Sequence, residues 1–297
     1  MNENLYIIAP IFNPWRYKSR ISLYNNFKKY VADSGAKLIT VELAHSDRDY
    51  VTDPDIKLRT NSELWHKEKM INLGIQQLPR DWKYVAWVDA DVVFARPDWV
   101  KETVQYLQHF PVVQMFSQAM DLSPKYEAMK IHEGIIYSHF EGKLVDATGK
   151  YDKFHPGFAW AATRKAINSL GGLFDTAILG SADRHMALSL LEVPQSVPKN
   201  LSKGYIEQLE LWGSRARQHI RRNVGYVPGL LLHHWHGRKA DRRYQDRWKI
   251  LVEHQYDGEF DLKLDWQGLW QFSGNKPRME QDIRRYFMAR NEDSTEI

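Results

Sequence analysis

The most constraining feature of this sequence is an apolar segment that carries two aspartates, Tyr84-Val85-Ala86-Trp87-Val88-Asp89-Ala90-Asp91-Val92-Val93-Phe94. The run before Asp89 is typical of a buried central strand, and burying a carboxylate without a partner is costly. Because side chains alternate along an extended segment, Asp89 and Asp91 are expected to point the same way at one edge of a sheet. Two oxygen ligands there predict a site for Mg²⁺ or Mn²⁺ that carries a diphosphate. The alternative is a turn with two solvated aspartates.

Strand and helix patterns alternate around this segment. Apolar runs predict strands at 5–10, 36–43, 56–58 and 112–116, and amphipathic periodicity predicts helices at 17–31, 64–78 and 99–109. Helices are also expected at 164–170, from about residue 182, within 199–222 and around 279–289, with an apolar strand inside 226–236. This order predicts an α/β fold with a parallel sheet and a ligand site at the carboxyl ends of its strands.

Two stretches lack a sustained period. Residues 117–153 are predicted to form an irregular insertion over the site, and residues 291–296 are expected to fray. We therefore expect a main domain over residues 1–254 and a C-terminal helical extension, residues 255–297, that packs on it.

Composition narrows the classes further. The 297 residues include no cysteine, so disulfides are excluded, and 43% are hydrophobic, enough for a sizeable core. No run approaches the roughly 20 apolar residues of a membrane span, and the first residues lack the basic start of a signal peptide. A soluble cytoplasmic protein is therefore expected.

The charge balance is mildly basic, since Lys plus Arg exceed Asp plus Glu by 41 − 37 = 4. That excess implies no nucleic-acid partner by itself, but basic residues gather in the C-terminal half, near its histidines. They are Arg215, Arg217, Arg221 and Arg222, and then Arg238, Lys239, Arg242, Arg243 and Arg247.

Five motifs follow one another along the chain. They are Pro10-Ile11-Phe12-Asn13, Lys69-Met70-Ile71-Asn72-Leu73-Gly74-Ile75, Asp89-Ala90-Asp91, the region from Pro156-Gly157-Phe158 to Gly180-Ser181-Ala182-Asp183, and His233-His234-Trp235-His236-Gly237-Arg238. Their order resembles the GT-A glycosyltransferases, within them the inverting β-1,4-galactosyltransferase-like and family 2-like enzymes. The resemblance implies a GT-A fold, a Rossmann-like mixed sheet flanked by helices. It also implies transfer of a sugar from a nucleotide diphosphate sugar, with UDP as the expected nucleotide and Mn²⁺, or Mg²⁺, as the cofactor.

The resemblance assigns the donor-binding residues. Pro10, Phe12 and Asn13 would contact the base and ribose, and Asp89 would face the ribose side of the nucleotide. Glu42, at a strand end, is a weaker candidate for the same contacts.

A second donor-binding pair comes from the helix predicted at 64–78. Lys69 and Asn72 lie three residues apart, on one helical face, and are expected to reach the donor. The alternative is that they are ordinary helix-surface residues. Arg238 and Lys239 are candidate contacts for the diphosphate or the acceptor, with a solvated basic face as the alternative.

The metal ligands are expected to be Asp91 and one or two late histidines. In a strict strand His234 and His236 share a face, whereas the family signature pairs His233 with His236. His236 belongs to both sets and is the first choice. A mixed carboxylate and imidazole site suits Mn²⁺ somewhat better than Mg²⁺.

By the resemblance, Asp183 is the catalytic base, although an aspartate there also favours a helix N-terminus. Phe158 and Trp160 are candidates for stacking against the acceptor, with core packing as the alternative. Ala182 departs from the family, which usually has a glutamate at that position that helps hold the acceptor. The acceptor class therefore does not carry over, and a glycan and a modified nucleic-acid base both remain.

Two other functions fit the same residues less completely. The acidic strand suits a metal-dependent phosphoesterase or nucleotidyltransferase, and the arginine clusters with the aromatics suit a non-enzymatic nucleic-acid-binding protein.

Overall fold

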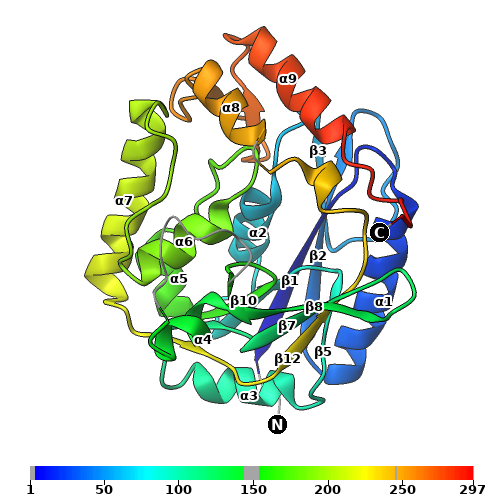
Figure 1. Ribbon diagram of the computed structural model, residues 1–297, viewed down its shortest axis with the longest axis vertical. Helices are drawn as coiled ribbons and strands as arrows, with labels where there is room; N and C mark the ends of the chain where they lie inside the picture. Colours follow the sequence, from blue (N-terminus) through cyan, green and yellow to red (C-terminus); the bar gives the residue numbers. More distant parts are fainter. Residues whose placement is uncertain (1–3, 144–153, 245, 297) are drawn as a thin grey trace.

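The computed structural model describes residues 4–143, 154–244 and 246–296. Its centre is a seven-stranded sheet in the order β11-β6-β10-β4-β1-β2-β3 (Figure 1). The strands are β1 (Leu5–Phe12), β2 (Lys37–His45), β3 (Ile56–Thr60), β4 (Tyr84–Val88), β6 (Val112–Gln114), β10 (Ala159–Thr163) and β11 (Val224–Tyr226).

The sheet is mixed rather than fully parallel. Strand β10 runs antiparallel to both β4 and β6, and the other neighbouring pairs are parallel. The parallel arrangement predicted from strand–helix alternation is therefore wrong at β10, because the chain enters this strand at Ala159, opposite the end of β4 at Val88, without crossing back over the sheet. The mixed sheet implied by the resemblance is confirmed.

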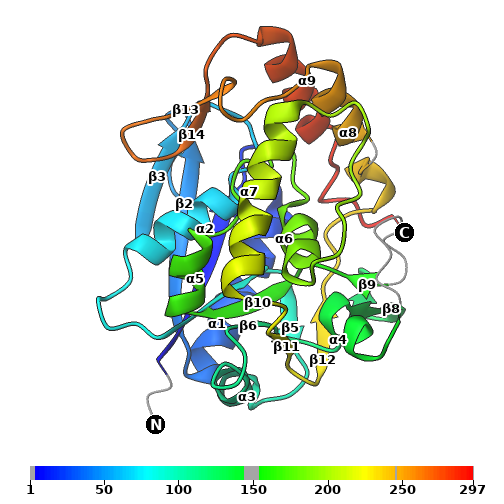
Figure 2. The same ribbon diagram turned by 90° about the vertical axis from the view of Figure 1, so that its left-hand side faces the viewer.

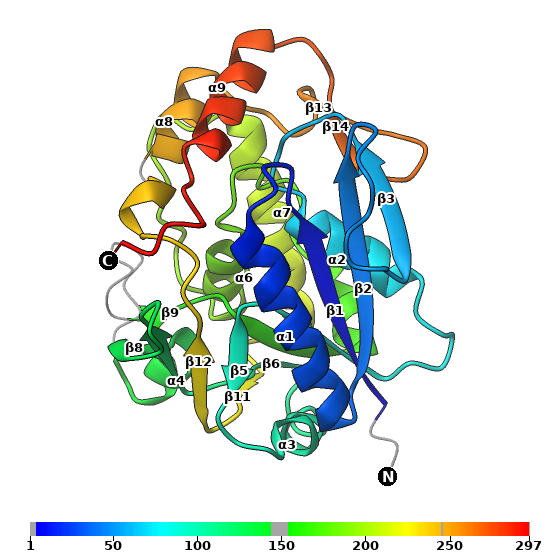
Figure 3. The same ribbon diagram turned by 90° about the vertical axis from the view of Figure 1, so that its right-hand side faces the viewer.

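Alternating side chains of the central strands serve two cores, one on each face. Ile7 and Ala9 of β1 pack in the core that contains Phe27 of α1, whereas Tyr6 and Ile8 pack in the core that contains Met70 of α2. On the first side lie α1 (Lys18–Ser34) and α3 (Trp99–Tyr106). On the second lie α2 (Lys67–Gln76), α5 (Arg164–Leu170), α6 (Ala182–Leu190) and α7 (Lys203–His219). Figures 2 and 3 show these two sets of helices on opposite sides of the sheet.

A second, five-stranded sheet has the order β5-β12-β7-β8-β9. Its strands are β5 (Val92–Phe94), β12 (Leu230–His233), β7 (Gln118–Leu122), β8 (Ala128–Gly134) and β9 (Phe154–His155). Strand β4 ends at Val88, directly before the aspartates, as expected, and β5 begins directly after Asp91 in the other sheet. The aspartates lie at the junction.

Of the region predicted to be an irregular insertion, 117–153, the described residues 117–143 lie mostly in regular elements. They form β7, β8 and α4 (Ile135–Phe140), and β7 and β8 pair antiparallel. The prediction is wrong there because residues 128–131 of β8 are all exposed, so the alternation that marks a half-buried strand is missing. Residues 144–153 of that insertion lie outside the described residues.

The C-terminal part of the chain packs over the end of the main sheet. It contains η1 (Ala240–Arg242), α8 (Asp246–Glu253), the hairpin β13 (Leu262–Leu264) and β14 (Trp270–Phe272), and α9 (Pro277–Met288). Leu269, Ile283 and Phe287 belong to the same core as α2 and α6, so the expected boundary at residue 254 does not separate two cores. Within the described ranges, none of the helices combines the length and the apolar character that a membrane crossing needs.

Candidate active site

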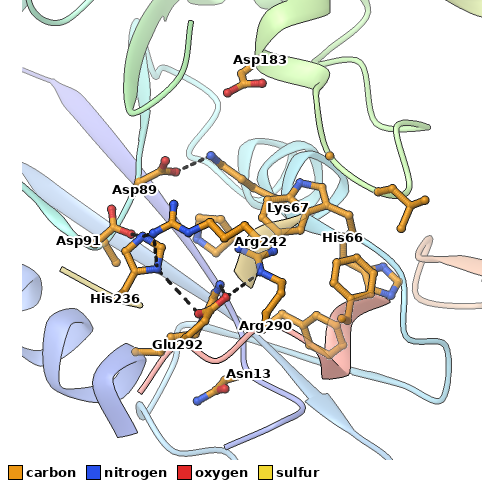
Figure 4. Close-up of a pocket in the computed structure, with 18 of the residues that line it drawn as sticks. Asn13, His66, Lys67, Asp89, Asp91, Asp183, His236, Arg242, Arg290 and Glu292 are labelled. Atoms are coloured by element: carbon orange, nitrogen blue, oxygen red, sulfur yellow. Dashed lines mark hydrogen bonds and ion pairs between the residues drawn. The ribbon is translucent and has the colours of Figure 1, made fainter. Parts of the chain in front are cut away.

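A cavity of about 480 Å³ opens at the carboxyl ends of β1 and β4 (Figure 4). Its wall includes the predicted residues Pro10, Phe12, Asn13, Asp89, Asp91, Phe158, Asp183, His233 and His236. Segments far apart in the sequence therefore meet at the edge of the sheet where a ligand site was expected.

Asp91, His233 and His236 form a cluster that suits a metal ion. One ligand atom from each lies within 4.8 Å of the others. The Nε2 atoms of the two histidines are 3.3 Å apart, and His236 Nε2 is 3.1 Å from Asp91 Oδ2. The other oxygen of Asp91, Oδ1, is buried and lacks a hydrogen-bond partner within the described part of the chain. One carboxylate and two imidazoles, with an unsatisfied oxygen among them, fit a divalent cation such as Mn²⁺.

His233 is oriented by a buried carboxylate behind it. Asp121 Oδ1 lies 2.8 Å from His233 Nδ1, and Asp121 Oδ2 is 2.6 Å from both His132 Nε2 and Lys239 Nζ. Burial alone would raise the pKa of Asp121, but the hydrogen bonds from His132, His233 and Lys239 outweigh it and hold that pKa well below its usual range. An ionised carboxylate at Nδ1 leaves Nε2 of His233 free to bind a metal.

His236 lies among cations. Arg242 Nη2 is 2.9 Å from His236 Nε2. Burial and then the positive charge of Arg242 hold the pKa of His236 well below its ordinary value, so its imidazole is neutral at pH 7 and keeps a lone pair for a ligand.

The sequence left three histidines as candidate ligands, and the structure separates them. His234 is not part of the cluster: its ring lies edge-on to Tyr126, at 5.7 Å between ring centroids. Only its backbone takes part in the site, because its N–H donates to the carbonyl oxygen of Asp91 at 2.8 Å.

Asp89 forms an ion pair with Lys67 of α2, seen in Figure 4 between Asp91 and Asp183. The next residue, Glu68, also lines the cavity and is 5% exposed. Its carboxyl group has no ion-pair partner among the described residues. Burial raises the pKa of Glu68 to about 8, with the charge of Asp183 adding to the rise and that of Lys67 opposing it. Glu68 is therefore mostly protonated at pH 7.

Asp183 projects from the first turn of α6 into the cavity (Figure 4). Its Oδ1 accepts a hydrogen bond from the N–H of Arg184 at 2.8 Å. Ser181, two residues before Asp183, has φ 83°, a left-handed conformation that is strained for a residue with a side chain. A Cβ on Gly157 would overlap Asp183 Oδ2, so only glycine at 157 leaves room for this carboxylate.

A match to a known protein family identifies the class of enzyme to which this chain belongs. The profile of "Glycosyl transferase family 2" matches residues 16–171, more than half of the chain, and includes Asp89 and Asp91. The chain belongs to glycosyl transferase family 2. It is therefore a glycosyltransferase, as the order of the motifs indicates.

Solved glycosyltransferase structures resemble this family 2 enzyme distantly. The catalytic domain of Drosophila β1,4-galactosyltransferase 7 is 11% identical, covering 93% of this chain and 96% of that chain, with a TM-score of 0.41. Glucosyl-3-phosphoglycerate synthase from Mycobacterium tuberculosis, in complex with Mg²⁺ and UDP, is 12% identical over 84% and 76%, with a TM-score of 0.40. Mannosyl-3-phosphoglycerate synthase from Rubrobacter xylanophilus is 10% identical over 90% and 83%, with a TM-score of 0.42. No curated protein matches the sequence.

Lys69 and Asn72, which were expected beside the donor, do not line the cavity of the glycosyltransferase. Asn72 Nδ2 donates to the carbonyl of Leu173 at 3.0 Å and to Asp175 at 2.9 Å, and its Oδ1 accepts from the N–H of Leu173 at 2.8 Å. Lys69 Nζ lies 3.4 Å from Asp175 and over the ring of Trp270. Both side chains connect α2 to neighbouring segments and are outside the cavity lining, because the face of α2 that carries them points away from it.

Three more expected contacts lie elsewhere as well. Glu42 accepts hydrogen bonds from the backbone N–H groups of Val51 and Thr52, so it organises a loop. Arg238 pairs with Asp241 and Glu296 on the surface. Trp160 is 4% exposed, and its indole N–H donates to the carbonyl of Pro156. None of these three is in the cavity wall.

Phe158 lines the cavity, but its ring already packs against two histidine rings. It stacks on His155 at 3.6 Å between ring centroids and lies 4.6 Å from the ring of His233. The ring therefore packs beside a candidate metal ligand, and the contacts favour support of His233 over stacking against an acceptor.

Sequence patterns missed several residues of the cavity wall. They are Tyr17, Arg20, His66, Lys67, Glu68, His132, Arg290 and Glu292. Arg290 and Glu292 come from the segment after α9, where fraying was predicted from residue 291 onward, and that prediction is wrong because Glu292 is 3% exposed. The second basic cluster near the histidines did indicate three other residues of the wall, Lys239, Arg242 and Arg247.

Proposed function

We propose that this glycosyltransferase is metal-dependent and inverting, and that it transfers a sugar from a nucleotide diphosphate sugar to an acceptor hydroxyl. The single observation that carries the proposal is that Asp91, His233 and His236 cluster in the cavity whose wall also contains Asp183. Sugar transfer to a hydroxyl needs both a metal site and a separate base, whereas a non-enzymatic nucleic-acid binder needs neither.

Asp91, His233 and His236 would hold the divalent ion. Such an ion acts as a Lewis acid that stabilises negative charge on a departing diphosphate. Around the cluster, the guanidinium groups of Arg20, Arg242 and Arg290 line the cavity and supply further positive charge. Arg242 hydrogen-bonds to the nitrogen of His236 that an ion would use, so we expect it to turn towards the diphosphate when both ligands bind.

Asp183 is the proposed base. It would accept the proton of the acceptor hydroxyl while that oxygen attacks the anomeric carbon. The bond from this carbon to the diphosphate oxygen breaks with its electron pair on the leaving group, and attack from the opposite face inverts the anomeric centre.

The pocket for the nucleotide would be formed by Pro10, Phe12 and Asn13 with His66. The rings of Phe12 and His66 meet edge to face at 5.3 Å, and all four residues line the cavity. The resemblance to β-1,4-galactosyltransferase-like enzymes makes UDP the first nucleotide to test. The acceptor is proposed only as a hydroxyl-bearing glycan or modified nucleic-acid base.

A panel of nucleotide sugars tests the proposal. The purified protein is incubated with each donor, with Mn²⁺ or with EDTA, and with glycan, lipid or DNA acceptors, and released nucleoside diphosphate is measured. We expect Mn²⁺-dependent release of UDP from one donor, with a β-linked product from an α-linked donor. Release of phosphate or pyrophosphate instead would contradict sugar transfer.

A further inference from the structure

Glu292 has no role in the function proposed above, yet it is among the most tightly held side chains of the cavity. Its carboxylate accepts from Nε and Nη2 of Arg20, the latter at 2.9 Å, and Oε1 lies 3.0 Å from Arg290 Nε. Its side chain is 3% exposed. Three carboxylate contacts to two guanidinium groups at a buried position fix the orientation of Glu292.

The segment that carries Glu292 is hydrogen-bonded to two separate parts of the chain beside the cavity. On one side, Asp293 accepts from the N–H groups of Lys18 and Ser19, at 3.0 and 2.8 Å, and so occupies the N-terminus of α1. On the other side, the indole N–H of Trp235 donates to the carbonyl of Ser294 at 2.6 Å. The segment therefore joins α1 to the histidine motif.

Gly237 shows how closely these two segments approach. It has φ +90°, and a Cβ there would overlap the backbone of Asn291 and come within 2.9 Å of Glu292 Cα. A glycine directly after His236 is needed both for the turn and for the contact with the C-terminal segment.

Each of the two candidate histidine ligands has a carboxylate on the side of its Nδ1 atom, as a hydrogen bond at His233 and as a longer ion pair at His236. His233 Nδ1 faces Asp121 at 2.8 Å, and His236 Nδ1 faces Glu292 Oε2 at 3.9 Å, while their Nε2 atoms converge on the same space beside Asp91. Figure 4 shows Glu292 below His236 and on the far side of it from Asp91. A carboxylate at the second nitrogen of a metal-binding histidine fixes the ring orientation and strengthens the ligand.

We propose that Glu292 is a positioning residue of the metal site. From the Nδ1 side it fixes the orientation of the His236 ring, while Arg20 holds Glu292 in place. The C-terminal segment 291–294 is then part of the active site rather than an appendage. This inference rests on the metal site of the proposed function and extends it to residues that no motif marks.

Mn²⁺ binding tests the inference without any sugar transfer. Free Mn²⁺ is measured by electron paramagnetic resonance during titration of the nucleotide-free protein. We expect Glu292→Gln to weaken Mn²⁺ binding by about tenfold, the lower end of the effect of such partners. Arg20→Gln, which leaves the carboxylate but removes its anchor, should weaken binding in the same direction. Glu296→Gln is the matched control, because Glu296 lies two residues after the segment 291–294 and pairs with Arg238 at the surface.

A double-mutant cycle separates positioning from general support of the fold. If Glu292 acts through His236, Glu292→Gln should add little to the loss of Mn²⁺ affinity caused by His236→Ala, whereas it should cause its full loss when combined with the neutral control Glu296→Gln. Circular dichroism and thermal unfolding establish that each variant is folded. Unchanged Mn²⁺ affinity in both folded Glu292→Gln and Arg20→Gln, or additive losses with His236→Ala, would overturn the inference.

The outcome is independent of the proposed reaction. A protein that releases no nucleoside diphosphate from any donor, but loses Mn²⁺ affinity in Glu292→Gln, would refute the function and retain the role of Glu292. A wild-type protein that binds no Mn²⁺ would overturn the role of Glu292 together with the metal site.

Discussion

Among the residues of the site, the three late histidines differ in what their rings face. His233 and His236 turn their Nε2 atoms towards Asp91, whereas His234 turns its ring towards Tyr126. Sequence spacing alone allowed either pair, because strict strand alternation favours His234 with His236. Strand β12 ends at His233, so alternation no longer applies beyond it.

This difference predicts a clear contrast between two alanine variants. His236→Ala should lower Mn²⁺ affinity more than tenfold, because it removes a ligand. His234→Ala, a matched change two residues earlier, should leave the affinity within about twofold. Titration followed by electron paramagnetic resonance measures both, and equal losses would show that the wrong histidine has been assigned.

Glu68 predicts a pH-dependent stability. The pKa of Glu68 is about 8 in the folded protein, and its ordinary value is 4.5. At a pH between these values, the Glu68 carboxyl group is ionised in the unfolded chain and protonated in the folded protein. The folded state then binds the extra proton, and its stability falls as pH rises through this window. We expect the free energy of unfolding of the wild type to fall, relative to Glu68→Gln, by about 1 kcal/mol per pH unit between about pH 5 and pH 7. Urea unfolding at several pH values measures the difference, and parallel pH profiles would contradict it.

At the scale of elements, Asn72 connects α2 to the turn that follows α5. Its amide makes three hydrogen bonds to Leu173 and Asp175, and Gly172 leaves room for it, since a Cβ there would lie 2.8 Å from Asn72 Oδ1.

The bonds of Asn72 predict a loss of stability rather than of donor binding. Asn72→Ala leaves the N–H of Leu173 without its partner, so we expect destabilisation of about 1–3 kcal/mol. The KM for the donor should stay within about twofold. Chemical unfolding and steady-state kinetics test the two parts, and a selective rise in KM without loss of stability would restore the donor role expected from the sequence.

The close approach of the segment between β9 and β10 to α6 predicts an effect of a single methyl group. In Gly157→Ala the new Cβ would overlap Asp183 Oδ2 and lie 3.3 Å from His155, so the carboxylate must move. We expect kcat to fall by about 10²-fold with the fold and Mn²⁺ affinity retained, because a displaced base transfers protons poorly. Full activity in Gly157→Ala would mean that the position of Asp183 is not important for the reaction.

The sequence predicted the elements that have strong periodicity and missed the contacts that depend on tertiary packing. Strands β1, β2 and β4 are recognisable because their apolar residues face two cores in alternation, and helix α1 because its apolar residues face one core at helical spacing. Strand β8 was missed because its first four residues are exposed.

The site shows the same division between local patterns and tertiary contacts. Asp89, Asp91 and Asp183 follow from motifs, and the structure places all three in one cavity wall. Asp121 and Glu292 could not be found, because nothing near them in sequence indicates that Asp121 meets His233 or that Glu292 meets Arg20.

On the scale of the whole molecule, the cavity is the place where the two sheets and the C-terminal segment meet. Asp91 lies between β4 of the first sheet and β5 of the second, and His233 ends β12, the neighbour of β5. The candidate metal cluster thus depends on the pairing of strands that are more than a hundred residues apart along the chain. Asp183, the proposed base, comes from the helical layer on the other side of the main sheet.

The most direct test is the Mn²⁺ dependence of nucleoside diphosphate release in the wild type, Asp91→Asn and Asp183→Asn. Release by the wild type should rise with Mn²⁺ and saturate. Asp183→Asn should saturate at the same Mn²⁺ concentration with kcat lowered by about 10²–10⁴-fold, and Asp91→Asn should need more than tenfold more Mn²⁺. If Asp91→Asn is activated at the same Mn²⁺ concentration as the wild type, the metal is not held where this account places it.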